Sequence, residues 1–329
     1  MKEKMFRKFS ILIIFVIQNV MAKECVNQEV YLNTNAEKSR NNVHRRCDRS
    51  DFFNFDASKH VVFYYTKDGK NYSKSPPTHC DKGEKVLLGI HGFCDEVDLK
   101  EKYWMYALMK VLLSTDEYKY GVIISYTDLC CNFLLVRGRI GRSIGDYLSN
   151  HITGTLGLRP SSVDAFAHSL GNRFLSYMAD DLRRNNKGQL NKIFALCIGS
   201  PILDLGLTGL HGDDARTVVN FISDNYNLIG SNQPRGDVNF YTNPHDRIQP
   251  GCTSSDCNHE MCINFFLASS LQSIRNDKDK FIYGKCNPNR NCPAADSSHK
   301  KAGPYASGRG CFCAETSACF PYWPKPTSS

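Results

Sequence analysis

The feature that most constrains this chain is the alternation of short, wholly apolar segments with longer amphipathic ones. Continuous apolar runs are typical of strands that are buried on both faces of a parallel sheet, and the intervening segments have helical spacing. The pattern predicts an α/β protein with a mostly parallel central sheet flanked by helices. The expected strands are residues 59–66, 86–90, 122–126, 163–167, 193–198 and 218–223, and the expected helices are residues 103–113, 139–148 and 170–182.

The N-terminus has the composition of a secretory signal peptide. Basic residues precede the apolar run Ile11–Ile17, and Val20-Met21-Ala22 offers small residues to a signal peptidase. The run is too short to cross a bilayer as a helix, so we expect no membrane-spanning protein. We predict cleavage after Ala22 and secretion; a short buried N-terminal helix is the alternative.

Charge and composition limit the class of partner. A hydrophobic content of 41% is ordinary for a globular protein. Residues 1–22 contain four basic residues and one acidic residue, so their removal lowers the formal charge from +8 to +5. This mildly basic balance favours an anionic lipid surface and is too small to predict nucleic-acid binding.

All 15 cysteines follow the expected cleavage site. A secreted chain is expected to be oxidised, and an odd number leaves at least one thiol unpaired. Cys197 is the candidate free thiol, because it lies within an apolar run. We interpret the crowded C-terminal cysteines as disulfides and expect no metal or other cofactor, with metal binding as the alternative. The sequon Asn71-Tyr72-Ser73 predicts glycosylation of Asn71 in a loop.

No repeat or linker interrupts the α/β pattern. Residues 1–22 are therefore interpreted as a signal peptide and residues 23–59 as a polar lead-in. Residues 60–323 are interpreted as one domain and residues 324–329 as a tail.

Ser169 stands between an expected strand and an expected helix, in the sequence Ala167-His168-Ser169-Leu170-Gly171. This nearly matches the G-x-S-x-G nucleophile elbow, with Ala167 in place of the first glycine. Such a turn would expose the Ser169 hydroxyl at a helix N-terminus, where the N–H of Leu170 can stabilise an oxyanion. An ordinary helix start is the alternative, but the strand-to-helix context favours a nucleophile.

A second oxyanion donor is expected from the loop after an earlier strand. Residues 86–90 are followed by His91-Gly92-Phe93, where the glycine allows close backbone approach. The backbone N–H of Phe93 is the candidate donor.

These motifs resemble the pancreatic lipase family, and within it the secreted arthropod and venom phospholipase A1-like branch. The resemblance extends from about Lys59 to Pro321. It implies a disulfide-rich α/β-hydrolase fold without the C-terminal β-sandwich domain of the vertebrate members. Besides the two motifs above, it rests on Trp104 and its helix and on residues 136–148, 214–215, 236–241, 249–252, 257–259 and 302–321.

By this resemblance His259 is the catalytic base. The family places its histidine directly after a cysteine-bounded lid, in a sequence like Cys257-Asn258-His259. A neutral imidazole on a loop late in the chain would take the Ser169 proton and return it to the leaving alcohol. A surface histidine beside a disulfide is the alternative. We interpret His168, inside the elbow, as structural, and His91 precedes the oxyanion glycine.

The acid is less clearly marked. The family has an aspartate in a Gly-x-Asp-Pro sequence, but Ser200 stands at that position here. Asp224, directly after the expected strand 218–223, needs no loop rearrangement and is the favoured acid. Asp204 is the alternative acid, and a chain without a functional acid is the third possibility.

The substrate is inferred from the expected lid. The resemblance implies that Cys252 and Cys257 pair and close a lid of only four polar residues, which is too short for an amphipathic flap. The second covering loop, residues 225–235, is also brief. In the venom branch such shortening accompanies phospholipase A1 activity, so we predict hydrolysis of the sn-1 ester of phospholipids through an acyl-enzyme. The expected partner is a lipid aggregate or membrane surface, contacted peripherally.

Three other functions remain open. The chain could be a catalytically impaired, lipase-like lipid-binding protein, comparable to insect yolk proteins. It could instead be a triacylglycerol lipase, or a toxin that does not depend on hydrolysis. The oligomeric state is not predicted.

Overall fold

A computed structural model describes residues 55–78, 81–100, 103–129, 138, 140–199, 209–226, 229–275, 281–318 and 322. The expected signal peptide, the C-terminal tail, the alternative acid Asp204 and nearly all of the polar lead-in lie outside the described residues.

Within these residues the centre of the molecule is a ten-stranded sheet in the order β1-β3-β2-β4-β5-β6-β7-β10-β8-β9. From β3 to β10 neighbouring strands run parallel, while β1, β8 and β9 pair antiparallel at the two edges. The strands are β1 Val62–Thr66, β2 Val86–Ile90, β3 Tyr120–Ser125, β4 Val163–Ser169, β5 Leu190–Ile198, β6 Ala215–Ile222, β7 Val238–Thr242, β8 Ile282–Lys285, β9 His299–Lys301 and β10 Gly310–Ala314.

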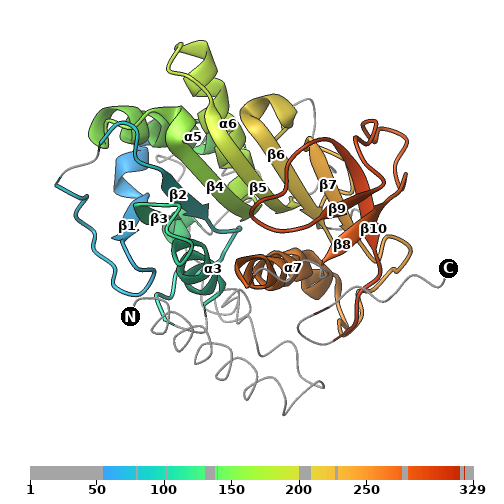
Figure 1. The fold of residues 1–329 in the computed structure, drawn as a ribbon. Helices are drawn as coiled ribbons and strands as arrows, with labels where there is room; N and C mark the ends of the chain where they lie inside the picture. Colours follow the sequence, from blue (N-terminus) through green and yellow to red (C-terminus); the bar gives the residue numbers. More distant parts are fainter. Residues whose placement is uncertain are drawn as a thin grey trace, which may run out of the picture.

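Helices cover both faces of the sheet (Figure 1). One face carries α5 and α6, and the other carries α3 and α7. The main helices are α3 Trp104–Leu113, α5 Gly141–Asn150, α6 Gly171–Arg184 and α7 Ser255–Ile274. The prediction of an α/β fold with a mostly parallel sheet between helices is confirmed. Among the described residues no β-sandwich is present, and no helix is long and apolar enough to cross a membrane.

Each face of the sheet has its own apolar core. Phe174 and Met178 of α6 pack toward one core, and Trp104 of α3 and Phe266 of α7 belong to the other. Because the central strands lie between the two cores, β2 is buried at every position. Burial on both faces explains why these strands are continuous apolar runs in the sequence.

Several elements were not predicted from the sequence. These are α7 and the strands β7 to β10. Helix α7 is buried against both α3 and the sheet, so apolar residues surround most of its axis, and twelve of its residues are buried. A helix buried on most sides lacks the amphipathic period by which helices are identified.

Three disulfides lie in the described part of the chain: Cys252–Cys257, Cys286–Cys313 and Cys292–Cys311. The thiol of Cys197 is free and buried, as predicted, and Cys262 is a second buried free thiol that was not predicted. The described residues contain no group of His, Cys, Asp and Glu side chains that could hold a metal ion. Asn71 is exposed, and its side-chain amide donates to Asp68 at 2.8 Å; its glycosylation remains a prediction.

Candidate active site

Ser169 is the last residue of β4 and has a φ of +52°. The pairing of β4 with β5 shifts register between His168 and Ser169, and α6 starts two residues later. A left-handed conformation costs a non-glycine residue roughly 1–2 kcal/mol, so such strain is typical of a functional turn. The strand, turn and helix required by the nucleophile-elbow motif are therefore all present, and Ala167 is fully buried where the motif has glycine.

The expected oxyanion segments lie against each other. A Cβ added to Gly171 would lie only 2.5 Å from the carbonyl oxygen of His91, so the start of α6 touches the end of β2 and glycine is required there. A Cβ on Gly92 would lie 3.3 Å from the Cβ of Ser169. Leu170 is buried at the N-terminus of α6, and Phe93 is half-buried beside the core.

His91 and His168 have the surroundings of structural residues. Burial lowers the pKa of His91 to about 4, and its Nε2 accepts from the backbone N–H of Tyr126 at 3.0 Å. Burial, together with the nearby His259, lowers the pKa of His168 to about 3. The Nε2 of His168 lies 3.1 Å from the carbonyl oxygen of His259, and since a carbonyl can only accept, this nitrogen carries the proton. The elbow thus contacts the backbone of the candidate base.

His259 lies in the second turn of α7, and the prediction that it lies on a loop was wrong. Ser254 caps this helix by accepting from the N–H of Cys257 at 3.2 Å, and the Cys252–Cys257 disulfide joins the first turn to the preceding segment. The expected short lid is therefore mostly the beginning of a helix. A serine N-cap and an acidic residue in the first turn, here Asp256, were the sequence signals that could have identified it.

Asp224 lies two residues after β6 and is 1% exposed. One carboxylate oxygen, Oδ2, accepts from the backbone N–H groups of Ile229 at 2.9 Å and Gly230 at 2.6 Å. These two bonds fix the carboxylate within the loop that follows the strand. The alternative acid Asp204 and the substituted position Ser200 lie outside the described residues.

Gly230 lies next to both the candidate acid and the candidate base. A Cβ on this residue would lie 2.6 Å from Nδ1 of His259 and 3.0 Å from Cβ of Asp224, so a larger residue would collide with both. Gly230 also forms an antiparallel bridge with Gly199, whose own added Cβ would lie 3.6 Å from Oγ of Ser169. The structure thus brings the predicted nucleophile, base and favoured acid to one edge of the sheet.

The candidate dyad contains unsatisfied buried atoms. Oδ1 of Asp224 and both ring nitrogens of His259 have no hydrogen-bond partner among the described residues. Each such atom costs about 1–3 kcal/mol of desolvation. A carboxylate oxygen and imidazole nitrogens are complementary partners, and catalytic hydrogen bonds often tighten only when a substrate is bound. The arrangement can therefore support general-base chemistry.

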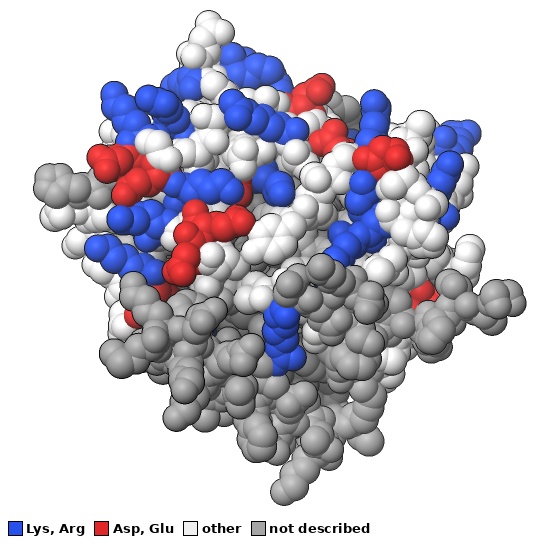
Figure 2. Space-filling view, in the orientation of Figure 1, with Lys and Arg blue, Asp and Glu red and all other residues white. Residues whose placement is uncertain are grey.

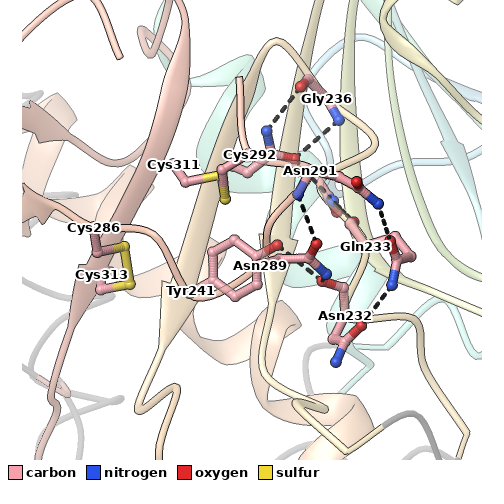
Figure 3. The surroundings of a disulfide bond; sticks show 12 residues. Asn232, Gln233, Gly236, Tyr241, Cys286, Asn289, Asn291, Cys292, Cys311 and Cys313 are labelled. Carbon is pink, nitrogen blue, oxygen red and sulfur yellow. Dashed lines mark hydrogen bonds between the residues drawn. A yellow bond between two sulfur atoms is a disulfide. The ribbon is translucent and has the colours of Figure 1, made fainter. Parts of the chain in front are cut away.

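The loop that carries Gly230 is fixed from outside by the cysteine-rich C-terminal segment (Figure 3). Nδ2 of Asn289 donates to the carbonyl oxygen of Asn232 at 3.4 Å, and Nδ2 of Asn291 donates to the side chain of Gln233 at 3.3 Å. The Cys292–Cys311 disulfide lies next to these contacts. The C-terminal disulfides therefore stabilise the loop that holds the acid.

Cys197 is a neighbour of the base that sequence reasoning did not assign to the site. It is 1% exposed, has a φ of +39°, and its Sγ lies 3.0 Å from Oγ of Ser223. Burial by itself lowers the pKa of His259, but Cys197, Asp224 and Glu260 outweigh this and raise it above 6.5. No sequence pattern links Cys197 to His259, since they lie on different elements far apart in the chain.

Replacing Cys197 with alanine is expected to lower the pKa of His259. A general base must be neutral, so activity is lost as the pH falls through the raised pKa of the imidazole. Without the thiol, the acid-side midpoint of the kcat/KM profile should move to lower pH. The measurement is hydrolysis of a soluble ester between about pH 5 and pH 9. Ser269→Ala, which removes a buried hydroxyl that donates to the carbonyl oxygen of Phe266 within α7, is the control, and an unmoved midpoint in Cys197→Ala would contradict the assignment.

Asp95 anchors the loop that follows His91-Gly92-Phe93. Its Oδ2 accepts from the indole N–H of Trp104 at 2.8 Å and from the hydroxyl of Tyr103 at 3.2 Å. Burial raises the pKa of Asp95 to about 7, although these two hydrogen bonds oppose the shift. The loop is thereby joined to the start of α3.

Asp95→Asn is expected to stabilise the fold at alkaline pH. Because the folded-state pKa is raised from 3.8 to about 7, the contribution of this carboxyl to stability is complete below about pH 4 and is lost as the pH rises to about 7. The asparagine keeps an acceptor for Trp104 and carries no charge. Its melting temperature should exceed that of the wild type at about pH 8, with the gap closing toward about pH 4. The exposed Asp246→Asn serves as control; a pH-independent gap would refute the argument.

Comparison with known proteins supports the resemblance drawn from the motifs. The chain is 23% identical to pancreatic triacylglycerol lipase of Ictidomys tridecemlineatus and 25% identical to that of Sus scrofa, over 218 residues in each case. These matches cover 60% of this chain and 44% and 46% of the relatives, so the chain spans about half their length. No family model matches. The similarity to pancreatic lipases is confirmed at this level, and the arthropod branch is not tested by these mammalian relatives.

Similarity to solved structures is weak. A thermophilic esterase of Thermogutta terrifontis aligns with a TM-score of 0.29 and 12% identity, over 49% of this chain and 65% of that one. A bacterial heroin esterase aligns with a TM-score of 0.25 and 14% identity, over 50% and 57%. TM-scores this low carry no conclusion about this chain.

Proposed function

We propose that this chain is a carboxylic ester hydrolase of the lipase type, with Ser169 as nucleophile, His259 as base and Asp224 as acid. The proposal rests on the arrangement around the bridged residues Gly199 and Gly230. Gly199 lies beside the strained Ser169, and Gly230 lies beside Asp224 and His259, whose buried Oδ1 and ring nitrogens have no hydrogen-bond partner among the described residues. The similarity to pancreatic triacylglycerol lipases supports the same reaction class.

The mechanism follows from these roles. His259 accepts the hydroxyl proton of Ser169 while Oγ attacks the ester carbonyl, and the tetrahedral oxyanion points toward the backbone N–H groups at Leu170 and Phe93. The imidazolium then gives its proton to the departing alcohol, which leaves an acyl-serine. Water, deprotonated by the same imidazole, releases the fatty acid and restores the serine. Asp224 would hold Nδ1 of the ring and stabilise its positive charge throughout.

We propose phospholipid as the substrate class, cleaved at the sn-1 ester. The residues between Cys252 and Cys257 are taken up by the cap and first turn of α7, which supports a site without a flap from this segment. Tyr226, two residues beyond Asp224, and Ile248 are 49% and 40% exposed, and in this proposal they contact the lipid aggregate.

We also propose that the protein is secreted and that its partner is not a nucleic acid. Three disulfides in the described residues favour an oxidising, extracellular environment. In the described part of the face in Figure 2, Lys and Arg side chains are interspersed with Asp and Glu. Such interspersed charges do not form the single-sign field that binding of a polyanion requires.

A fluorophosphonate probe tests the proposal directly. The full-length secreted protein is treated with the probe and digested, and the modified residue is identified by mass spectrometry. Labelling of Ser169 is expected, because only an activated serine reacts. Incubation with phosphatidylcholine that carries different acyl chains at its two positions should then release the sn-1 acid first. An equal or faster rate on emulsified triacylglycerol would exclude the phospholipid preference.

A lipase-like lipid-binding protein is the second candidate. It is favoured by serine at position 200, where the resemblance implies the acid, and by Ala167 in place of the first glycine of the elbow. The same probe discriminates between the two, because a non-enzymatic protein would bind phosphatidylcholine vesicles and leave Ser169 unlabelled.

A further inference from the structure

Gln249 is a buried amide in an otherwise exposed segment between β7 and α7. It is 1% exposed, although the residues from His245 to Ile248 face solvent. Its backbone N–H and its side chain make four hydrogen bonds to four different residues. The backbone N–H donates to Oδ1 of Asn258 at 2.7 Å, Nε2 donates to the carbonyl oxygens of Ser223 at 2.9 Å and Thr242 at 3.0 Å, and Oε1 accepts from Nδ2 of Asn243 at 2.7 Å.

Two of these partners directly precede the candidate acid and base. Ser223 comes before Asp224, and Asn258 comes before His259. The hydroxyl of Ser223 also donates to the carbonyl oxygen of Asn258 at 2.6 Å. Gln249 and Ser223 therefore join the end of β6 to the first turn of α7, next to both members of the dyad.

The chemistry of this position requires an uncharged amide of this length. Its NH₂ group donates to two carbonyl oxygens at the ends of the neighbouring strands β6 and β7, and its oxygen accepts from Asn243. A carboxylate would turn an acceptor toward the carbonyl oxygens, and an apolar side chain would remove both donors. Buried networks of this kind specify one arrangement when every member is satisfied.

We propose that Gln249 is a positioning residue that fixes the separation of Asp224 and His259. The inference rests on the proposed function, because it assigns a role within the same site. Gln249 does not contact the reacting atoms and acts through Ser223 and Asn258. Displacing catalytic groups by about 1 Å can cost roughly 100-fold in rate.

The test compares two isosteric apolar substitutions, Gln249→Met and Asn239→Leu. Asn239 is a buried amide on β7 whose hydrogen bonds go to Gly236 and Asn220, away from the dyad. On a soluble p-nitrophenyl ester, Gln249→Met should lower kcat about 100-fold with KM changed less than about 3-fold. Asn239→Leu should leave kcat per folded molecule within about 3-fold, although both variants lose stability.

Further measurements separate positioning from a loss of folding. The rate constant of fluorophosphonate labelling depends only on folded molecules, because unfolded protein is not labelled. This rate constant should fall in parallel with kcat. The acid-side midpoint of the pH profile should also move to lower pH, because Asp224 raises the pKa of His259 less when it is displaced. If Gln249→Met does not fold, Ser223→Ala breaks the same connection with a smaller change and should lower kcat about 10-fold.

The outcomes distinguish the two hypotheses. If wild-type protein is not labelled at Ser169, the proposed function fails. If wild type is labelled, but Gln249→Met and Ser223→Ala both keep wild-type kcat and pH midpoint per folded molecule, the positioning role is overturned and the proposed function stands.

Discussion

Replacing Ser169 with alanine is expected to reduce kcat on a soluble ester by about 10⁶-fold and to abolish fluorophosphonate labelling. The attacking oxygen belongs to this side chain alone, so no neighbouring group can substitute for it. Alanine has the same Cβ at the same strained φ, so the turn keeps its backbone conformation. The melting temperature should therefore change little.

The matched control is Ser162→Ala. Ser162 immediately precedes β4, at the opposite end of the strand from Ser169, and its hydroxyl donates to the carbonyl oxygen of Arg159 at 2.8 Å. The hydroxyl also lies 3.4 Å from the carbonyl oxygen of Lys82, so this variant loses both contacts, about 1 kcal/mol of stability, and should keep full activity. If Ser169→Ala keeps more than about a tenth of wild-type kcat, the nucleophile has been misassigned.

Much of the sheet could be predicted because its central strands are wholly apolar. The run at residues 86–90 matches β2 at both ends, since every residue there packs into one of the two cores. The start of β5 was missed, because Asn191 and Lys192, which follow its buried first residue Leu190, are polar and only half-buried and interrupt the apolar run. Strand boundaries in polar sequence depend on pairing with neighbours, which a single chain does not reveal.

The site could be predicted in part. Ser169 was recognisable because the elbow is a local feature, defined by the strand before it and the helix after it. The neighbourhood of His259 was not recognisable, because Gly230, Cys197 and Gln249 reach it through long-range packing. The helix that carries His259 also lacked the amphipathic pattern, since most of its surface is buried.

Replacing the favoured acid, Asp224, is expected to have the second largest effect on kcat. Asp224→Asn should lower kcat about 10⁴-fold, while Asp204→Asn should leave it within about 3-fold. The asparagine can keep its oxygen on the N–H groups of Ile229 and Gly230. Its NH₂ group would then face His259 and favour the wrong tautomer of the imidazole. The readouts are kcat and the pH midpoint, which should move to lower pH because a neighbouring negative charge is removed.

Asp237→Asn is the matched control, because it removes another carboxylate that accepts from a backbone N–H beside β6 but lies far from the candidate base. Its Oδ2 accepts from the N–H of Val218 near the beginning of β6, whereas Asp224 follows the end of that strand. A loss of activity in Asp204→Asn, with Asp224→Asn unaffected, would reassign the acid to Asp204. If neither aspartate matters, His259 works without a carboxylate, and the unsatisfied Oδ1 of Asp224 beside Gly230 would need a structural explanation instead.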